Sequence, residues 1–130
     1  MSTVFEIAFR YVVPSIRREA VLELLRKGFS KVEVSRALGI SKSLVSRYAK
    51  GERGKLLEVG HHPVVRNAVD KIAYLVESGE ASEHKIEEEI VKAVVKLLSA
   101  KALCGFHEKL DRRFNPMVCQ ICVRVFSKQQ

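Results

Sequence analysis

Four side chains near the end of the sequence have the types and spacing of metal ligands. Cys104 and His107 form one pair, and after eleven residues Cys119 and Cys122 form another, giving C-x2-H-x11-C-x2-C. One turn can aim each pair at a single ion, and zinc takes four such nitrogen and sulfur ligands in a tetrahedron. All three cysteines of the 130-residue chain fall in this segment. We therefore expect a zinc site in a tail that spans residues 104–130.

Two other interpretations of the cysteine segment stay open. Thiolates also hold iron–sulfur clusters, which would make iron the metal. Alternatively, the cysteines are small buried apolar residues and His107 lies at the surface. Four protein ligands leave no open position for a water molecule, which disfavours hydrolytic chemistry. Disulfide bonds are not expected, because the cysteine count is odd and the sequence indicates a reducing compartment.

A second group of side chains is suited to contacting DNA. The segment Lys31–Lys50, KVEVSRALGISKSLVSRYAK, predicts two short helices that meet at a tight turn. Gly39 supplies the positive φ that the turn requires, and Ser35 is the small residue needed where the helices cross. The apolar positions that fill the angle between the helices are Val34, Leu38, Ile40, Val45 and Tyr48. This pattern is typical of a helix-turn-helix, although a plain helical hairpin with a solvated basic face is the alternative.

The second helix of such a motif enters the major groove, where its outward side chains contact base edges. The outward positions are all polar or basic: Ser41, Lys42, Ser43, Ser46, Arg47 and Lys50. Of these, Arg47 and Lys42 can donate to guanine O6 and N7, and the serines can bond a base or a phosphate. The cations expected to contact DNA phosphates are Arg17, Arg18, Lys31, Arg53 and Lys55.

The formal net charge of +8 is concentrated in the first part of the chain. Residues 1–60 carry a balance of +6, residues 61–103 of −1, and residues 104–130 of +3. Such an excess favours an anionic partner, with nucleic acid first. No run of about 18 apolar residues and no secretory signal is evident, so we expect a cytoplasmic protein without a membrane partner. Catalytic and nucleotide-binding motifs are also missing, so we expect neither enzyme activity nor a small-molecule substrate.

Helices are expected to position these residues, so the predicted fold class is all-α. Residues 1–55 are predicted to form a helix-turn-helix domain, whose first helix has Pro14 in its first turn and ends at Gly28. Ser30 and Ser41 are predicted to cap the next two helices.

Residues 63–103 are expected to form two longer amphipathic helices, with Ser82 capping the second. We expect this region to carry dimerisation, although its apolar stripes could equally pack within one subunit. Short strands remain open at residues 4–13, where aromatic and β-branched residues alternate, and at residues 117–126. His61 and His62, beside Pro63, are interpreted as linker residues.

One stretch resembles a known family. Residues Arg10–Gly54, RYVVPSIRREAVLELLRKGFSKVEVSRALGISKSLVSRYAKGERG, resemble the DNA-binding region of predicted archaeal transcriptional regulators of the xenobiotic-response-element (XRE, Cro/C1-like) type. They are also similar to the N-terminal region of archaeal thiamine-biosynthesis regulators. The resemblance covers about a third of the chain and implies a DNA-binding regulator. The effector domain of those thiamine regulators cannot fit in the remaining residues, so thiamine sensing is not implied.

The sequence therefore predicts a transcription regulator that binds specific double-stranded DNA as a homodimer and carries structural zinc. In one alternative, the Cys/His cluster is a metal or redox sensor that changes DNA affinity. In another, the protein is an RNA-binding or partner-binding adaptor, in which Phe106, Phe114 and Phe126 stack on bases.

Overall fold

All regular structure in the described part of the chain is helical. The computed structural model describes residues 3–54, 59–113, 115 and 117–127. Its elements are α1 (Val4–Ile7), η1 (Ala8–Val12), α2 (Val13–Arg26), α3 (Lys31–Leu38), α4 (Lys42–Ala49), α5 (Pro63–Glu77), α6 (Glu83–Ser99), α7 (Cys104–Leu110) and α8 (Ile121–Phe126). The all-α class is thus confirmed. The strands considered for residues 4–13 and 117–126 are wrong, since the first range is helical and α8 occupies most of the second.

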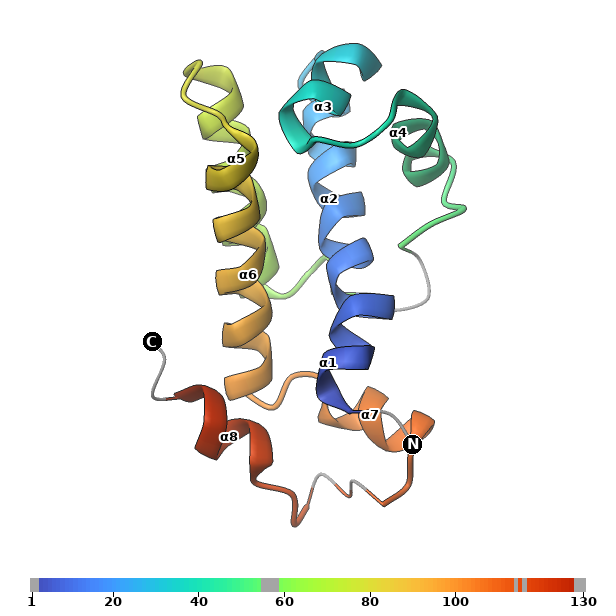
Figure 1. Cartoon of the computed structure of the whole chain (residues 1–130), viewed down its shortest axis with the longest axis vertical. Coiled ribbons are helices and arrows are strands. Elements are labelled where there is room, and N and C mark those ends of the chain that lie inside the picture. Colours follow the sequence, from blue (N-terminus) through green and yellow to red (C-terminus); the bar gives the residue numbers. More distant parts are fainter. Residues whose placement is uncertain (1–2, 55–58, 114, 116, 128–130) are drawn as a thin grey trace.

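The elements α1, η1 and α2 follow one another as a single helical column (Figure 1). Pro14 lies in the first turn of α2 as expected, but the residues before it are helical as well. The segment η1 is a π-helical turn, in which the Val13 N–H donates to the Ala8 carbonyl five residues earlier. Proline has no N–H to donate within a helix. The π-helical turn, which is wider than an α-helical turn, lies directly before the turn that contains Pro14. The Ser15 hydroxyl donates to the Tyr11 carbonyl at 2.6 Å.

The serine cap of α3 and the glycine ending of α2 form as the sequence predicts. Ser30 and Glu33 form a complete capping box, with Glu33 N donating to Ser30 Oγ at 3.1 Å and Ser30 N to Glu33 Oε1 at 2.9 Å. At the end of α2, Gly28 takes φ +98°, and the N–H of Phe29 reaches back to the Leu24 carbonyl. This is a Schellman ending, which requires a left-handed residue at that point.

The apolar stripes of α5 and α6 are buried within one chain. The first core cluster joins them to the α1–α2 column and to the tail, with Val65, Val69, Ile72, Ile90 and Leu97 all at most 2% exposed. Figure 1 shows α6 beside α5, with α2 next to this pair. The stripes that led us to expect a dimer are therefore already used for packing inside the subunit.

A second cluster holds α3 and α4 against α2. Its buried members are Val21, Leu24, Val34, Val45, Tyr48 and Ala73. Because Ala73 belongs to α5, the two clusters meet at that helix. The small motif is thus attached to the rest of the molecule by core packing rather than by a linker alone.

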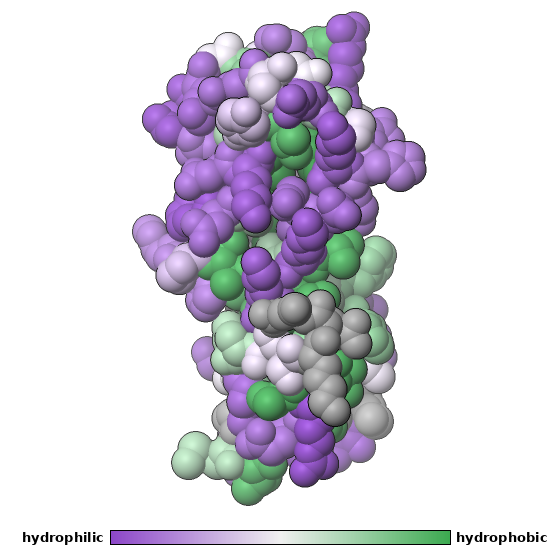
Figure 2. Space-filling view, turned by 90° about the vertical axis from the view of Figure 1, so that its left-hand side faces the viewer, coloured by the Kyte–Doolittle hydropathy of each residue, from purple (hydrophilic) through white to green (hydrophobic). Residues whose placement is uncertain are grey.

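Two aromatic contacts attach the tail to the start of the chain. Phe126 of α8 meets Phe5 edge to face with ring centroids 6.2 Å apart, and Phe106 of α7 meets Tyr11 at 5.1 Å. Figure 1 places α7 and α8 at the end of the molecule opposite to α3 and α4. One side of the molecule is largely hydrophilic over its upper part, with apolar surface interspersed toward the tail (Figure 2).

Candidate functional site

The helix α4 presents most of the residues predicted to contact bases. Ser41 caps it by accepting a hydrogen bond from Leu44 N at 3.1 Å, and Lys42 and Ser43 of the first turn are exposed. Ser41, Lys42, Ser43, Arg47 and Lys50 are exposed, whereas Ser46 is half-buried. The structure therefore brings five of the six predicted side chains to the surface of one short helix and its flanks.

The opposite face of α4 is fully buried. Val45 and Tyr48 are 0% exposed and pack in the second cluster against α2 and α3. The Tyr48 hydroxyl is itself buried, and it has no hydrogen-bond partner among the described residues. Because the helix is anchored along this whole face, its outer side chains are carried on a rigid support.

The turn between α3 and α4 forms where the sequence predicts it. Gly39 takes φ +65° and ψ +34°, and the Ile40 N–H donates to the Ser35 carbonyl at 3.1 Å. A Cβ atom at Gly39 would come within 2.8 Å of Glu83 Cδ, so the first residue of α6 lies directly against the turn. Of the other expected positions, Val34 is buried and Leu38 and Ile40 are half-buried.

The cations on this side of the molecule differ in how they are engaged. Lys42, Arg47, Lys31 and Arg53 are exposed, and none forms an ion pair within the described ranges. The sequence of α4 itself, KSLVSRYA, contains no acidic residue. Such uncompensated positive charge favours an anionic partner.

Two of the predicted phosphate contacts are otherwise engaged. Arg17 lies 3.7 Å from Glu87 of α6, and Arg18 lies 3.5 Å from Glu19. The Arg18 Nε is also buried without a partner among the described residues, beside the turn that contains Gly54. Glu87 and the Gly54 turn are distant in sequence from these arginines, so the local sequence gives no signal of either contact. Lys55 lies outside the described residues.

The four predicted metal ligands lie in or beside α7 and α8. Cys122 and His107 are each 8% exposed, while Cys104 and Cys119 are half-buried. Burial raises the pKa of the Cys104 and Cys122 thiols, and in both cases nearby cysteines raise it further. No group of three or more His, Cys, Asp or Glu side chains in the described part of the chain is arranged to hold a metal ion.

The phenylalanines considered for base stacking are largely used for packing. Phe126 is 8% exposed and Phe106 is half-buried, and both make the aromatic contacts given above. Phe114 lies outside the described residues. Phe106 and Phe126 therefore do not offer a free stacking surface at α7 and α8.

The sequence analysis missed the role of His62, which was interpreted as a linker residue. The Nδ1 atom of His62 accepts a hydrogen bond from Val64 N at 3.2 Å and so caps α5. The signal was a polar side chain directly before Pro63, a residue favoured in the first turn of a helix.

Among the helices of the described residues, none combines the length and apolar character needed to cross a membrane. Comparisons of the chain with known protein families, with curated proteins and with solved structures find no match.

Proposed function

We propose that this chain is a sequence-specific, double-stranded DNA-binding transcription regulator. It acts in the cytoplasm by occupying its operator and has no enzyme activity. One observation carries the proposal: α4 is anchored by Val45 and Tyr48, while Lys42, Ser43 and Arg47 stand exposed on its other side. A rigid helix with a polar, cationic outer face has the form that major-groove contact requires.

In this proposal, α4 lies in the major groove with its first turn toward the bases. Arg47 and Lys42 donate to guanine, and Ser43 bonds a base or a phosphate. Lys31 and Arg53 contact the phosphates, since both are exposed cations without an ion pair within the described ranges. Arg17 and Arg18 are assigned a smaller part because carboxylates already hold them.

The regulator is proposed to bind as a homodimer, because helix-turn-helix operators present two half-sites about 34 Å apart. The stripes of α5 and α6 are buried inside the subunit, so a partner would have to use their outer faces. Sedimentation with and without a two-half-site duplex gives the number of chains per complex. A monomer on such a duplex at saturating concentration would contradict this part.

The DNA proposal is tested by selecting duplexes from a random library and measuring anisotropy with the selected and a scrambled duplex. Arg47→Ala is expected to remove about 1–3 kcal/mol of the preference for the selected duplex. Lys31→Ala should weaken both duplexes alike, because phosphate contacts carry no sequence information.

Arg10→Ala is the matched control, since Arg10 is an exposed arginine on η1, away from α4. Failure to enrich any duplex, or an Arg47→Ala variant that behaves like Arg10→Ala, would contradict the proposal. Tight binding of single-stranded RNA without a duplex preference would favour the adaptor alternative instead.

We also propose that Cys104, His107, Cys119 and Cys122 bind one structural zinc ion. Three thiols and one imidazole at one end of the molecule are a donor set that zinc takes. Their described positions do not form a metal site, so binding requires the four side chains to change their arrangement. Metal binding of this kind is coupled to folding, and here it would stabilise the tail.

Metal content measured after anaerobic, untagged purification tests this assignment, with one zinc per chain expected. Cys119→Ser should lower that content and the Tm, whereas His84→Gln, at an exposed position in α6, should change neither. Iron with sulfide would support the iron–sulfur alternative. Metal-free protein would contradict the site. Operator affinity that follows metal loading would identify the cluster as a sensor rather than a structural site.

A further inference from the structure

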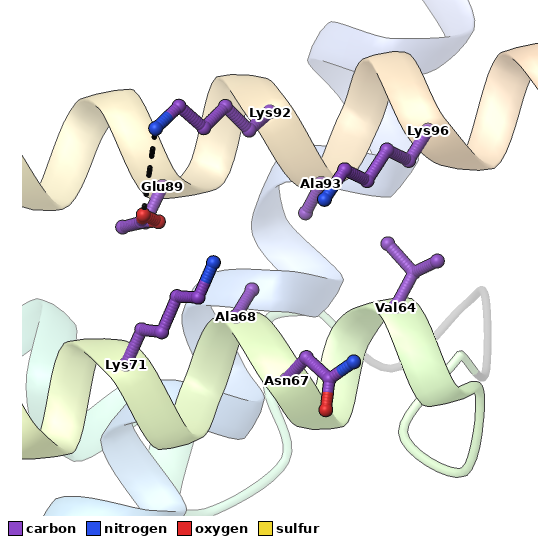
Figure 3. A pocket seen from close by; sticks show the side chains of 8 residues that line it. All are labelled: Val64, Asn67, Ala68, Lys71, Glu89, Lys92, Ala93 and Lys96. Atoms are coloured by element: carbon purple, nitrogen blue, oxygen red, sulfur yellow. Dashed lines mark ion pairs between the residues drawn. The ribbon is translucent and has the colours of Figure 1, made fainter. Parts of the chain in front are cut away.

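A lysine-lined groove runs between α5 and α6, and neither the DNA contacts proposed for α4 nor the cysteine site uses it. Its lining residues are Val64, Asn67, Ala68 and Lys71 from α5, and Glu89, Lys92, Ala93 and Lys96 from α6. Within each helix the other three positions follow the first by three, four and seven residues, so each set occupies one helix face. Figure 3 shows the two faces side by side with α2 behind them, so the groove opens away from α2.

Small residues create the hollow in this groove. Ala68 and Ala93 are 6% and 2% exposed and form its floor, where longer side chains would fill the space. The resulting hollow has a volume of about 50 Å³. A single water molecule needs roughly 10–15 Å³ by the same measure, so the hollow can accept a tetrahedral ion with several oxygen atoms.

The charges around the hollow are unbalanced. Three lysines, Lys71, Lys92 and Lys96, line the hollow together with one carboxylate, that of Glu89. Glu89 lies 3.8 Å from the Lys92 ammonium (Figure 3). Lys92 also pairs with Glu88 at 3.7 Å. Lys71 and Lys96 form no ion pair within the described ranges. The charges of Lys71 and Lys96 are therefore not offset by an ion pair among the described residues, and they favour an anionic group in this hollow.

A larger hollow adjoins the first one. It has a volume of about 330 Å³ and is lined by Asp70, Lys71, Tyr74, Leu75 and Glu89. Lys71 and Glu89 line both hollows, so the two lie next to each other. The Tyr74 ring is 64% exposed at the edge of this space. A flat apolar group that extends from the smaller hollow would lie against this ring.

We propose that this groove binds a small organic phosphate. The phosphate group occupies the smaller hollow, where the ammonium groups of Lys71, Lys92 and Lys96 surround it and the Asn67 amide donates a hydrogen bond. The remainder of the molecule lies along the larger hollow beside Tyr74. This site shares no element and no side chain with the DNA contacts proposed for α4.

Amide chemical shifts test the site, with inorganic phosphate and phenyl phosphate as probes at constant ionic strength. We expect saturable shifts centred on residues 64–75 and 89–96. The double variant Lys71→Gln/Lys96→Gln should weaken binding by about tenfold or more, because it removes two charges a few ångströms from the anion. Both lysines are exposed, so the fold should survive, which circular dichroism checks.

Lys85→Gln/Lys109→Gln is the matched control, since it removes the same charge from exposed positions outside the groove. Equal weakening of phosphate binding in both double variants would overturn the proposal, and so would shifts centred on α3 and α4. Either result would mean that phosphate is attracted by the overall positive charge of the protein and not by this groove. Phenyl phosphate should bind more tightly than inorganic phosphate, and Tyr74→Ala should abolish that difference. Equal affinities of the two probes would overturn the assignment of the larger hollow.

Discussion

Arg47 and Tyr48 are adjacent in the chain, but one side chain is exposed and the other is buried. Tyr48 is 0% exposed in the second core cluster, while Arg47 is exposed. Successive residues of an α-helix point roughly 100° apart, so one turn of α4 can serve both packing and recognition. Substitutions of Arg47 should therefore change binding with little effect on stability, whereas substitutions of Tyr48 should lower stability and also weaken the support of α4.

Gly54 and Gly28 allow a stability prediction at matched positions. Both have positive φ, at +74° and +98°, so alanine at either site costs about 1–2 kcal/mol of backbone strain. At Gly54 a Cβ would also clash with the Pro14 carbonyl oxygen, whereas at Gly28 it meets nothing within 4 Å. Gly54→Ala is therefore expected to destabilise the fold by about 1–3 kcal/mol more than Gly28→Ala.

Urea unfolding of the two variants measures this difference. Equal losses of stability would mean that the turn after α4 is not seated on α2 as described. The comparison uses the same substitution in both cases, so the change in unfolded-chain entropy cancels.

Single residues also show the limit of sequence-based prediction. The exposed side chains of α4 were predictable, because the apolar positions of the motif fix which side faces out. The engagement of Arg17 with Glu87 was not, because the partner lies 70 residues away on another helix. Local patterns can show which side chains are charged, but not which charges are already paired.

The helix ends were predictable because their determinants are local. Ser30, Ser41 and Ser82 each accept a hydrogen bond from a backbone N–H three residues ahead. The first turns of the chain were not predictable in the same way. Their alternating apolar residues also fit a strand, and the helix is supported by distant contacts such as that of Phe5 with Phe126.

The capping box of α3 gives a prediction about pH. The pKa of Glu33 is lowered from its ordinary value of 4.5, first because the Ser30 backbone N–H donates to the carboxylate. A group whose folded-state pKa is lowered contributes stability above its unfolded pKa and loses it as the pH falls. The Tm difference between the unmodified protein and Glu33→Gln should therefore be present at neutral pH and shrink below about pH 4.5.

Glu80→Gln provides the control for this experiment, since Glu80 is exposed and lies outside the helices. A difference that is constant from neutral to acidic pH would show that the charge of Glu33 does not support the cap. Gln can itself complete a capping box, so the comparison isolates the charge from the hydrogen bond.

The two core clusters are joined through α2, which places Ile16 and Ala20 in one and Val21 and Leu24 in the other. We therefore expect the whole molecule to unfold in one cooperative transition. Leu24→Ala and Leu97→Ala remove the same atoms from sites that are both 0% exposed, one in each cluster. Each should cost about 2–5 kcal/mol.

Calorimetry and hydrogen exchange distinguish this from independent folding. Both variants should lower the protection of amides in α4 and in α6 together. If Leu24→Ala weakened only α3 and α4, the motif would be a separate unit, and the shared role of α2 would be wrong.

The π-helical turn at Ala8–Val12 determines the rotational position of the side chains of α1, which precedes it. Relative to a regular α-helix, it amounts to one extra residue. Deletion of one residue there would rotate the preceding segment by roughly 100° and take Phe5 away from Phe126. It would also return the Pro14 ring toward a clash with the carbonyl of the preceding turn. The length of this short stretch is therefore as constrained as its composition, and related sequences should vary there by substitution rather than by insertion or deletion.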